Sequence, residues 1–468
     1  RLRGTQVRKR SVTMGDAAVR RPPQVLRGMR DFTPRQMLLR QRVMEVLRQV
    51  FERYGYDPID TPLLEYYEVL SGKYGEEGEK LLYRFVDQGG REVGLRYDLT
   101  VPLARYVAVH RAELTFPFKR YHIGPVFRAE RPQRGRFRQF WQCDVDVVGT
   151  RSMMADAEVL SVWIDALGAL RIPNAVIHVN HRQLLEALVR AAGVAPSLAL
   201  GVFRTIDKLA KIGLDGVREE LLRIGVEAPA AERVLAAIAL RGEPESIIPQ
   251  LRVMFAGDEA AERAVSELAE LFRYLEWFGV RPGSAIVDLS LARGLDYYTG
   301  PVAEAIVSEP AIGSLGGAGR YDHLIGLFLG EEIPATGASL GLERLVEVVD
   351  EYGLLPTPAS VTEVLVVSVE ADHRAQALRI ARELRQAGLA TEVYLGERID
   401  LRRQLQYADR KGVPVAVIIG PDEIANDMVT VRDLRTGEQV RVPRAELVAA
   451  VRKPLGAARQ GERGSADE

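Results

Sequence analysis

Five arginines, several aromatic residues and two carboxylates crowd into one short stretch of the chain. Residues 127–142 read FRAERPQRGRFRQFWQ, and the acidic CDVDVVG follows at once. If 119–130 and 137–148 are two strands joined by a loop, the side chains of each strand alternate between two faces. The second strand then has an apolar face, made of Phe137, Trp141, Cys143, Val145 and Val147, and a polar face, made of Arg138, Phe140, Gln142, Asp144 and Asp146. Arg128 and Glu130 share a face of the first strand, so the polar side chains could surround one cavity.

These residue types suit a site for a nucleotide and a second, cationic or ring-bearing ligand. Guanidinium groups bind phosphate through two parallel hydrogen bonds and keep their charge when desolvated. Phe140 could stack on a base, and the carboxylates could hold an ammonium or an imidazole. A solvated hairpin laced with ion pairs is the alternative, but the interleaving of aromatic and charged residues favours the nucleotide site.

Two later stretches could also contribute to a site, one through polar side chains at a turn and one through glycines. LARGLDYYTG, residues 291–300, joins two predicted strands, and strand ends can aim side chains into a pocket. The side chains at this turn are Arg293, Asp296, Tyr297 and Tyr298. A hairpin whose tyrosines merely pack is the alternative. In GSLGGAGRYDHLIG, residues 313–326, the glycines let the backbone approach another group closely.

Several other kinds of site are disfavoured by their context. GASLG at 337–341 matches the GxSxG motif of serine hydrolases. In those enzymes the serine lies on a sharp turn directly after a strand, whereas the residues before this motif, GEEIPAT, do not read as a strand. We expect these glycines to let a helix sit tightly against a sheet. The sequence has no GxxxxGK[ST], so an ATP site would not be a P-loop. His178 and His181 lack carboxylate or thiol company, which favours ordinary polar positions over a metal site.

Length, charge and cysteine content narrow the class of protein. A chain of 468 residues is too long for one core, which predicts two or three domains. The net charge of −1 argues against a generally basic surface, so a nucleic-acid partner would meet local patches. Cys143 is the only cysteine, which excludes an internal disulfide and fits a reducing compartment. No apolar run approaches the roughly 20 residues that a membrane helix needs.

The periodicity of apolar residues predicts an α/β protein with two folded parts. An α+β domain with an antiparallel sheet covers 22–180 and 279–352 and opens with a helix over 34–54. A helical insertion, 181–278, interrupts it. After the linker GLLPTPAS, alternating strands and helices over 361–455 predict a small α/β domain with parallel pairing.

The two ends are expected to be disordered. Residues 1–21 carry seven Lys or Arg and one acid without an apolar segment, which excludes a secretory signal. A mitochondrial presequence and a stretch upstream of a start at Met14 both remain open for residues 1–13. The tail 456–468 is polar and has nothing to bury.

Taken together and in this order, four motifs resemble one family. FRAERPQRGRFRQF, LARGLDYYTG, GGAGRYD and GASLGLERL, with a helical insert after the first, are similar to histidyl-tRNA synthetase, a class II aminoacyl-tRNA synthetase. The resemblance covers about residues 22–453, including a C-terminal anticodon-binding domain. It implies activation of L-histidine with ATP to histidyl-adenylate and transfer of histidine to the terminal adenosine of tRNA-His. YDLT and QCDVDV look more like the eukaryotic and archaeal branch.

The resemblance also implies roles for individual residues at the ATP site. Arg128 and Arg293 would hold the α-phosphate from opposite sides and act as the catalytic pair. Glu130 would meet the adenine amino group, and Phe140 would stack on adenine. Arg136 and Arg344 would grip the β- and γ-phosphates, where Mg²⁺ is expected.

For the amino acid, the resemblance implies a pocket of carboxylate, amide and tyrosine side chains. Its expected members are Asp98, Thr100, Gln142, Asp146, Arg293, Tyr297, Tyr298, Arg320 and Tyr321. The first three would bind the ammonium, and Asp146 with the tyrosine pair would surround the imidazole, whose two distinct nitrogens allow discrimination by hydrogen bonding.

The resemblance further implies a cytoplasmic homodimer that binds tRNA. The helix 34–54 and DPIDTPLLEYY would form the dimer, and the insert and C-terminal domain would meet tRNA, the latter through Arg398, Arg402, Arg403, Arg410 and Lys411. It is equally open that these five cations form a solvated helix face and do not bind tRNA. A histidine-sensing regulatory paralogue of ATP phosphoribosyltransferase is the alternative function, but it typically lacks the C-terminal domain and some of these arginines.

Overall fold

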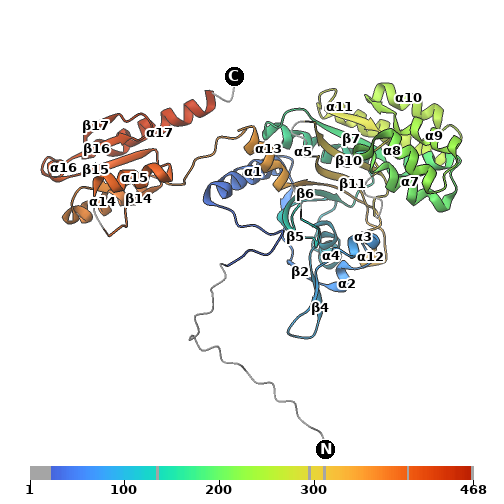
Figure 1. Ribbon diagram of the computed structural model, residues 1–468, viewed down its shortest axis with the longest axis horizontal. Coiled ribbons are helices and arrows are strands. Elements are labelled where there is room, and N and C mark those ends of the chain that lie inside the picture. Colours follow the sequence, from blue (N-terminus) through green and yellow to red (C-terminus); the bar gives the residue numbers. More distant parts are fainter. Residues whose placement is uncertain (1–22, 133–135, 293–296, 309–312, 398–399, 465–468) are drawn as a thin grey trace, which may run out of the picture.

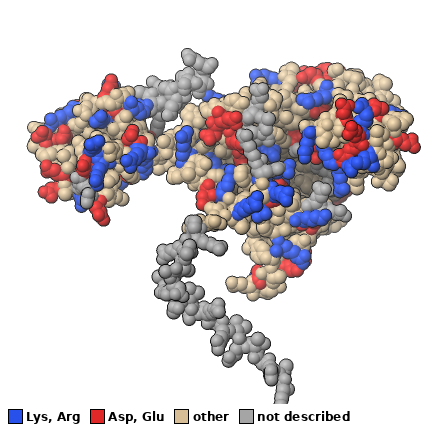
Figure 2. All heavy atoms as spheres, in the orientation of Figure 1, with Lys and Arg blue, Asp and Glu red and all other residues tan. Residues whose placement is uncertain are grey.

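Two sheet-containing parts, joined by an extended linker, make up the protein (Figure 1). The computed structural model describes residues 23–132, 136–292, 297–308, 313–397 and 400–464. Basic and acidic side chains are interspersed over the face of both parts seen in Figure 2, as expected for a net charge of −1.

A nine-stranded sheet forms the centre of the larger part. Its strands, in spatial order, are β1 (Asp57–Pro58), β5 (Phe118–Phe127), β6 (Gln139–Val148), β12 (Ala335–Gly341), β11 (Ser314–Arg320), β10 (Pro301–Val307), β7 (Ala175–His181), β9 (Ala285–Asp288) and β8 (Arg241–Gly242). The six strands from β5 to β7 are antiparallel, whereas β1 pairs with β5 and β9 pairs with β7 in parallel. The predicted antiparallel sheet is therefore confirmed.

The two faces predicted for the arginine-rich hairpin are present within strand β6, whereas Phe137 and Arg138 precede it. Cys143, Val145 and Val147 are buried in the core, while Asp144 lies opposite His122 of the neighbouring strand on the other face. Phe137 was expected on the apolar face, but it precedes the first residue of β6 and is only half-buried. Strand alternation does not govern its side chain, because it lies in the connection between the strands.

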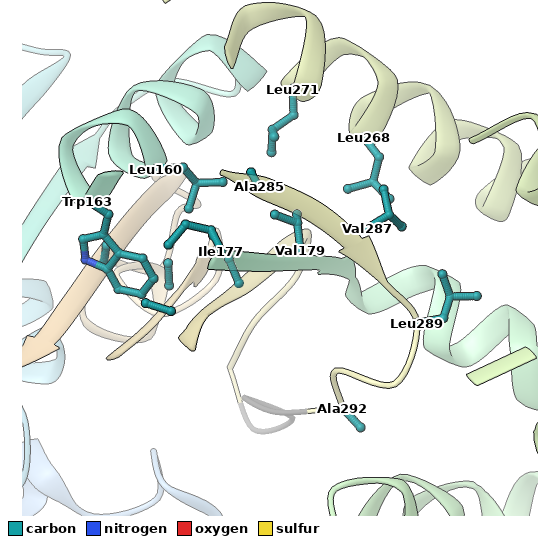
Figure 3. Packing of buried hydrophobic residues seen from close by; sticks show 14 of the residues in the cluster. Leu160, Trp163, Ile177, Val179, Leu268, Leu271, Ala285, Val287, Leu289 and Ala292 are labelled. Atoms are coloured by element: carbon teal, nitrogen blue, oxygen red, sulfur yellow. The ribbon is translucent and has the colours of Figure 1, made fainter. Parts of the chain in front are cut away.

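Four helices cover the apolar face of the sheet: α1 (Pro34–Arg53), α5 (Met153–Ala169), α11 (Glu259–Trp277) and α13 (Leu342–Glu351). The first of them begins where the sequence predicts, because Thr33 and Gln36 form a capping box around Pro34. Figure 3 shows Leu160 and Trp163 of α5 and Leu268 and Leu271 of α11 on the side of the neighbouring strands β7 and β9 from which Ile177, Val179, Ala285 and Val287 project. The core therefore fills the space between these helices and the sheet.

The helical block between β7 and β9 consists of α6 (Arg182–Ala191), η1 (Pro196–Leu198), α7 (Ala199–Ile206), α8 (Leu209–Arg223), α9 (Ala228–Ile238), α10 (Pro244–Met254) and α11. It also contributes strand β8 to the edge of the large sheet. The buried residues of these helices belong to the same apolar cluster as the sheet. The block is thus helical, as predicted, and shares one core with the sheet domain.

A small layer of sheet and helices lies over the other, polar face near β5 and β6. It comprises β2 (Leu64–Tyr66), β3 (Arg84–Val86), β4 (Glu92–Leu95), α2 (Tyr67–Leu70), α3 (Gly75–Glu79), α4 (Thr100–His110) and α12 (Gly326–Leu329). Its apolar cluster includes Tyr74, Leu103, Phe118 and Tyr321, so this layer is packed onto the large sheet.

The C-terminal part is a separate α/β unit with its own core. Its five strands, in spatial order, are β14 (Thr391–Val393), β13 (Val364–Ser368), β15 (Val415–Ile419), β16 (Met428–Asp433) and β17 (Gln439–Pro443). Its helices are η2 (Ala371–His373), α14 (Arg374–Gln386), α15 (Leu401–Lys411), α16 (Pro421–Ala425), η3 (Arg444–Glu446) and α17 (Leu447–Gly464). The first three strands are parallel, as predicted, and the last two are antiparallel additions.

Helix α17 ends at Gly464 and so extends into the segment 456–468 that was expected to be disordered. Ala, Arg, Gln and Glu, which are good helix formers, are frequent in this stretch. Within the part of the chain described above, no helix has the length and apolarity needed to cross a membrane.

The shared core predicts that a buried leucine of the helical block stabilises the whole larger part. Leu268→Ala removes a side chain that is fully buried against β9, and we expect a loss of about 2–5 kcal/mol in the free energy of unfolding. Urea titration followed by tryptophan fluorescence measures it, because Trp141, Trp163 and Trp277 all lie in this part. Leu200→Ala, at a side chain that is 58% exposed, is the control and should change stability by less than about 0.5 kcal/mol. Equal effects of the two changes would contradict a shared core.

Candidate functional site

The polar face of the large sheet forms the floor of a cavity of about 580 Å³. The predicted site residues that line it are Asp98, Thr100, Arg128, Glu130, Arg136, Phe140, Gln142, Asp146, Tyr297, Tyr298, Tyr321 and Arg344. They come from β6, from the loops around it, from the start of α4 and α13 and from the end of β11. Arg293 and Asp296 lie outside the described residues. The structure therefore brings together nearly all of the side chains that were predicted to share one site.

Aromatic rings and a guanidinium group form one end of the cavity. The guanidinium of Arg128 lies 4.2 Å from the ring centroid of Tyr97 and 5.0 Å from that of Phe140. Its Nε also donates to the Tyr97 carbonyl at 3.2 Å. A flat ring that stacked on Phe140 would lie beside a cation that could bind a phosphate attached to it.

Two more arginines face the same end. Arg136 is 54% exposed and lies 3.9 Å from the Glu130 carboxylate, so it is loosely held. Arg344 lines the cavity from the first turn of α13 and donates to the carbonyl of Ser314. Both are placed where a flexible polyphosphate chain could reach them.

Glu343, next to Arg344, fixes the start of α13 against the sheet. Its carboxylate accepts hydrogen bonds of 2.9 Å from Arg40 of α1 and from the backbone N–H of Trp141. Arg30 lies 3.7 Å from the same carboxylate and stacks over the ring of Phe137 at 3.3 Å. The sequence places Glu343 on this helix, but nothing in the sequence shows that its partners come from residues about 200 and 300 positions away.

Three buried carboxylates form the other end of the cavity. Asp98 accepts the hydroxyl of Tyr74 at 3.1 Å and the backbone N–H groups of Thr100 and Val101, at the start of α4. Asp146 forms an ion pair of 2.6 Å with Arg120 and accepts the hydroxyl of Tyr321. Burial raises the pKa of both carboxyls, although nearby guanidinium groups oppose the shift.

Asp144, the third carboxylate, lies on the same face of β6 as Asp146 and lines the same cavity. Burial, together with the negative charge of Asp146, raises the pKa of this carboxyl to about 7, although Arg120 opposes the shift. Its neighbour across the strands, His122, has its pKa lowered to about 3 by burial and by the positive charges of Arg120 and Arg96. His122 is therefore neutral near pH 7, and Arg120 is the cation that faces these carboxylates from β5.

Glycines of the central strands make room for the cavity side chains. A Cβ at Gly337 would lie 1.9 Å from Oδ1 of Asp146, and one at Gly319 would lie 2.7 Å from the ring of Tyr298. Each glycine therefore admits a polar side chain to the sheet surface. The sequence predicted close backbone approach at Gly319 without revealing which group approaches. At Gly337 it predicted helix packing, whereas the group that lies against this glycine is the side chain of Asp146.

Two predicted arginines point elsewhere. Arg320 was expected in the histidine pocket, yet strand alternation places it on the face of Ala318, which is the apolar one. Its guanidinium pairs there with Asp156 of α5 and with Asp322, and it donates to the carbonyls of Thr150 and Ser152. Arg138, assigned to the polar face of its strand, donates to the carbonyls of Arg27 and Glu130 instead.

The other candidate motifs also have structural explanations. Ser339 of the GxSxG match lies in the middle of strand β12, not at an elbow, and accepts a 2.7 Å hydrogen bond from Gln142. His178 and His181 do have carboxylate partners, contrary to expectation: Asp288 at 2.7 Å and Glu267 at 2.8 Å. These partners are 110 and 86 residues away in the chain, so the local sequence around each histidine could not predict them. Within the described ranges, no group of three His, Cys, Asp or Glu side chains could hold a metal ion.

Family models match both parts of the chain. The model described as histidyl-tRNA synthetase matches residues 28–345, which include the whole cavity. The model described as anticodon binding domain matches residues 363–454.

Curated relatives and solved structures agree with these matches. The histidine-tRNA ligase of Aeropyrum pernix is 44% identical over 93% of this chain and 98% of its own length, and that of Gloeobacter violaceus is 41% identical over 89% and 96%. The crystal structure of histidyl-tRNA synthetase from Nostoc sp. PCC 7120 has a TM-score of 0.82 and 34% identity, covering 92% of this chain and 99% of that one. A Bacillus halodurans protein described as an ATP phosphoribosyltransferase regulatory subunit/histidyl-tRNA synthetase has a TM-score of 0.70 and 25% identity, covering 86% of this chain and 99% of that one.

The position of Arg320 predicts a structural effect rather than a binding effect. Arg320→Met leaves the buried Asp156 carboxylate unpaired, and we expect a loss of about 3–5 kcal/mol in the free energy of unfolding. Asp156→Asn, which breaks the same pair from α5, should lower stability as well. The affinity for a cavity ligand, measured below the unfolding temperature, should change less than about threefold in both variants. A stable Arg320→Met protein with a large loss of ligand affinity would instead place this guanidinium in the cavity.

Proposed function

The chain belongs to the histidyl-tRNA synthetase family, and we propose that it acts as a histidine-tRNA ligase through the cavity described above. The ligase activates L-histidine with ATP to histidyl-adenylate, releases pyrophosphate, and transfers histidine to the terminal adenosine of tRNA-His. One observation supports the site more than any other: arginines and an aromatic ring that suit a nucleotide line the same cavity as three buried carboxylates that suit an amino acid. One cavity could therefore hold both halves of histidyl-adenylate.

ATP binds at the aromatic end in this proposal. Phe140 stacks on adenine, Glu130 accepts from the adenine amino group, and Arg128 binds the α-phosphate. Arg136 and Arg344 bind the β- and γ-phosphates. The support for these roles is that all five side chains line the same cavity.

Histidine binds at the carboxylate end. Asp98, Thr100 and Gln142 hold its ammonium group, and the imidazole lies among Asp146, Tyr297, Tyr298 and Tyr321. The two tyrosines of the pair lie with ring centroids 4.8 Å apart, and Tyr297 lies 6.2 Å from Tyr321, so the three rings form a continuous wall. Such a wall and the carboxylates behind it suit a flat ring with polar nitrogens.

The first reaction then needs placement and charge stabilisation rather than a protein nucleophile. A carboxylate oxygen of histidine attacks the α-phosphorus, and the bond from phosphorus to the pyrophosphate oxygen breaks. Arg128, and Arg293 from the other side, stabilise the negative charge that develops on the phosphoryl oxygens. In the second reaction a ribose hydroxyl of the tRNA attacks the histidyl carbonyl and AMP leaves.

Mg²⁺ would accompany the phosphates of ATP. It prefers oxygen ligands and usually keeps several waters while binding substrate phosphates. The phosphate-facing side chains proposed here are guanidinium groups, and Glu343 is already bonded to Arg40 and to Trp141. The chain would thus leave most of the magnesium coordination to ATP and water.

The C-terminal α/β unit would bind tRNA. On α15, Arg402, Arg403 and Arg410 are exposed and could contact phosphates, whereas Lys411 is paired with Glu392. Arg398 lies outside the described residues. A cytoplasmic location, where tRNA is charged, completes the proposal.

The regulatory paralogue is the less favoured function. The anticodon-binding match over residues 363–454 and the histidine-tRNA ligase names of the curated relatives both favour the enzyme. Purified protein should exchange labelled pyrophosphate into ATP only when histidine is present, and it should charge tRNA-His. Binding of histidine without any exchange would favour the sensor instead.

Arg293→Ala should slow adenylate formation strongly while the fold is retained. Removing one donor to a developing oxyanion typically costs a factor of about 100 to 1,000 in rate. Single-turnover formation of histidyl-adenylate measures the loss, and unchanged circular dichroism with an unchanged unfolding midpoint is the control. Near-normal turnover in this variant would refute its catalytic role.

A homodimer is also part of the proposal. Leu64 and Tyr66, at the end of the segment expected to form the interface, are 47% and 51% exposed in the single chain and would be covered. Sedimentation equilibrium should give twice the chain mass of 51.9 kDa. A single species at the chain mass across the accessible concentrations would contradict the dimer.

A further inference from the structure

The buried carboxylate of Glu343 joins three elements that meet beside the proposed contacts with ATP. The residue is 8% exposed and lies in the first turn of α13. We propose that Glu343 is a positioning residue for ATP binding. It holds Phe140 and Arg344, the proposed contacts with adenine and phosphate, and links them to Arg40 of α1. This inference rests on the proposed function, because those two contacts belong to it.

The Glu343 carboxylate replaces a backbone acceptor where the pairing of β6 with β12 stops. The last partners in that pairing are Gln142 and Gly341, so Trp141 would face residue 342 if β12 continued. Leu342 begins helix α13 instead. The N–H of Trp141 donates to the carboxylate at 2.9 Å, so the side chain continues the ladder by one hydrogen bond.

This hydrogen bond fixes the backbone next to Phe140. Phe140 precedes Trp141 on β6 and lines the cavity. On the other side of β6, Phe140 is paired with Val126 of β5. Because this part of the strand is held from both sides, its backbone has little freedom, and the Phe140 ring is presented to the cavity in one direction.

The same hydrogen bond fixes the first turn of α13. Arg344 follows Glu343 in this turn and lines the cavity. A carboxylate in the first turn also interacts favourably with the positive end of the helix dipole. With the turn held against β6, the guanidinium of Arg344 reaches into the cavity from a fixed backbone position.

Two arginines hold the carboxylate from the N-terminal part of the chain. Arg40 is 3% exposed and donates to Oε1 of Glu343 at 2.9 Å, and Arg30 lies 3.7 Å from the same oxygen. Their guanidinium groups lie 4.1 and 5.0 Å, respectively, from the ring centroid of Phe32. A buried carboxylate with charged partners that are themselves held in place has little freedom to move.

The two arginines line a second cavity, of about 680 Å³. Phe137 and Glu343 line this cavity and the first one as well. Arg30, which lies 3.3 Å from the ring centroid of Phe137, contacts both of these shared residues. A change at Arg40 can therefore affect ATP binding through Glu343, without any contact between Arg40 and ATP.

Glu343→Gln tests the positioning role. The amide oxygen can still accept from Trp141, but it carries no charge to hold Arg40, so the first turn of α13 should move. The KM for ATP in pyrophosphate exchange should rise about 10-fold, because a small misplacement of binding groups is costly. The KM for histidine should stay within about twofold of the wild-type value.

Arg40→Met tests the link to α1. This change should raise the KM for ATP about three- to tenfold, although the side chain lies in the second cavity. The double variant with Glu343→Gln should have the same KM for ATP as Glu343→Gln alone, because both changes break the same pair.

Asp156→Asn is the matched control. It breaks another buried carboxylate–guanidinium pair, with Arg320, and should lower the unfolding midpoint. Its KM values for ATP and histidine should both stay within about twofold of the wild-type values. If Glu343 had only a structural role, its variant would behave in the same way.

Amide hydrogen exchange gives a test in the unmodified chain. A non-hydrolysable ATP analogue should slow the exchange of the Trp141 amide and of the α1 amides around Arg40, because binding stabilises the whole connected group. Exchange in α9, which belongs to the helical block, should not change.

The outcomes separate this inference from the proposed function. In a wild type that catalyses pyrophosphate exchange, an unchanged KM for ATP in Glu343→Gln, or equal rises in both KM values, would overturn the positioning role alone. Slower hydrogen exchange at Trp141 without any change in α1 would overturn the link to Arg40. A wild type without histidine-dependent pyrophosphate exchange would refute the proposed function itself. If Glu343→Gln does not fold, hydrogen exchange in the wild type still decides.

Discussion

The buried guanidinium of Arg120 is the interaction on which the rest of the site depends. It is fully buried, it forms an ion pair with Asp146 on β6, and it donates to the carbonyl of Leu99 just before α4. One side chain of β5 thus connects the strand that carries Asp144 and Asp146 with the segment that carries Asp98 and Thr100. Without this cation, Asp144 and Asp146 could not both be buried on one strand at a tolerable cost in free energy.

The sheet makes this charge arrangement possible because one of its faces is apolar and the other is polar. One face packs against α1, α5, α11 and α13 and supplies the hydrophobic free energy that holds the strands in place. The opposite face can then carry unfavourably buried polar groups. Gly337 lets Asp146 lie flat on the strand beside it, and Glu343 fixes the start of α13 beside the nucleotide end. Many of the proposed ligand-binding side chains therefore lie on or next to rigid strands. This favours the precise placement of the substrates that adenylate formation needs.

Much of this arrangement could be predicted from local sequence. Strand alternation correctly separated Cys143, Val145 and Val147 from Gln142, Asp144 and Asp146, and the spacing of apolar residues placed the start of α1. Motif resemblance correctly grouped residues that lie far apart in sequence, such as Asp98 and Tyr321.

Long-range partners could not be predicted in the same way. Arg320 lies next to Tyr321, but it faces α5 because alternation turns it to the other side of the strand. His178 and His181 are paired with carboxylates on β9 and α11, and the spacing of these residues in the sequence does not reveal the pairs. The contacts of Asp146 with Arg120, Tyr321 and Gly337 join residues far apart in sequence, which only the tertiary structure brings together.

A crystal structure of the chain with a non-hydrolysable sulfamoyl analogue of histidyl-adenylate would test the central claim most directly. The account predicts adenine stacked on Phe140 and an imidazole that lies among Asp146, Tyr297, Tyr298 and Tyr321, with a ring nitrogen within about 3.2 Å of a polar atom of that pocket. An imidazole outside that pocket, or an adenine away from Phe140, would contradict it.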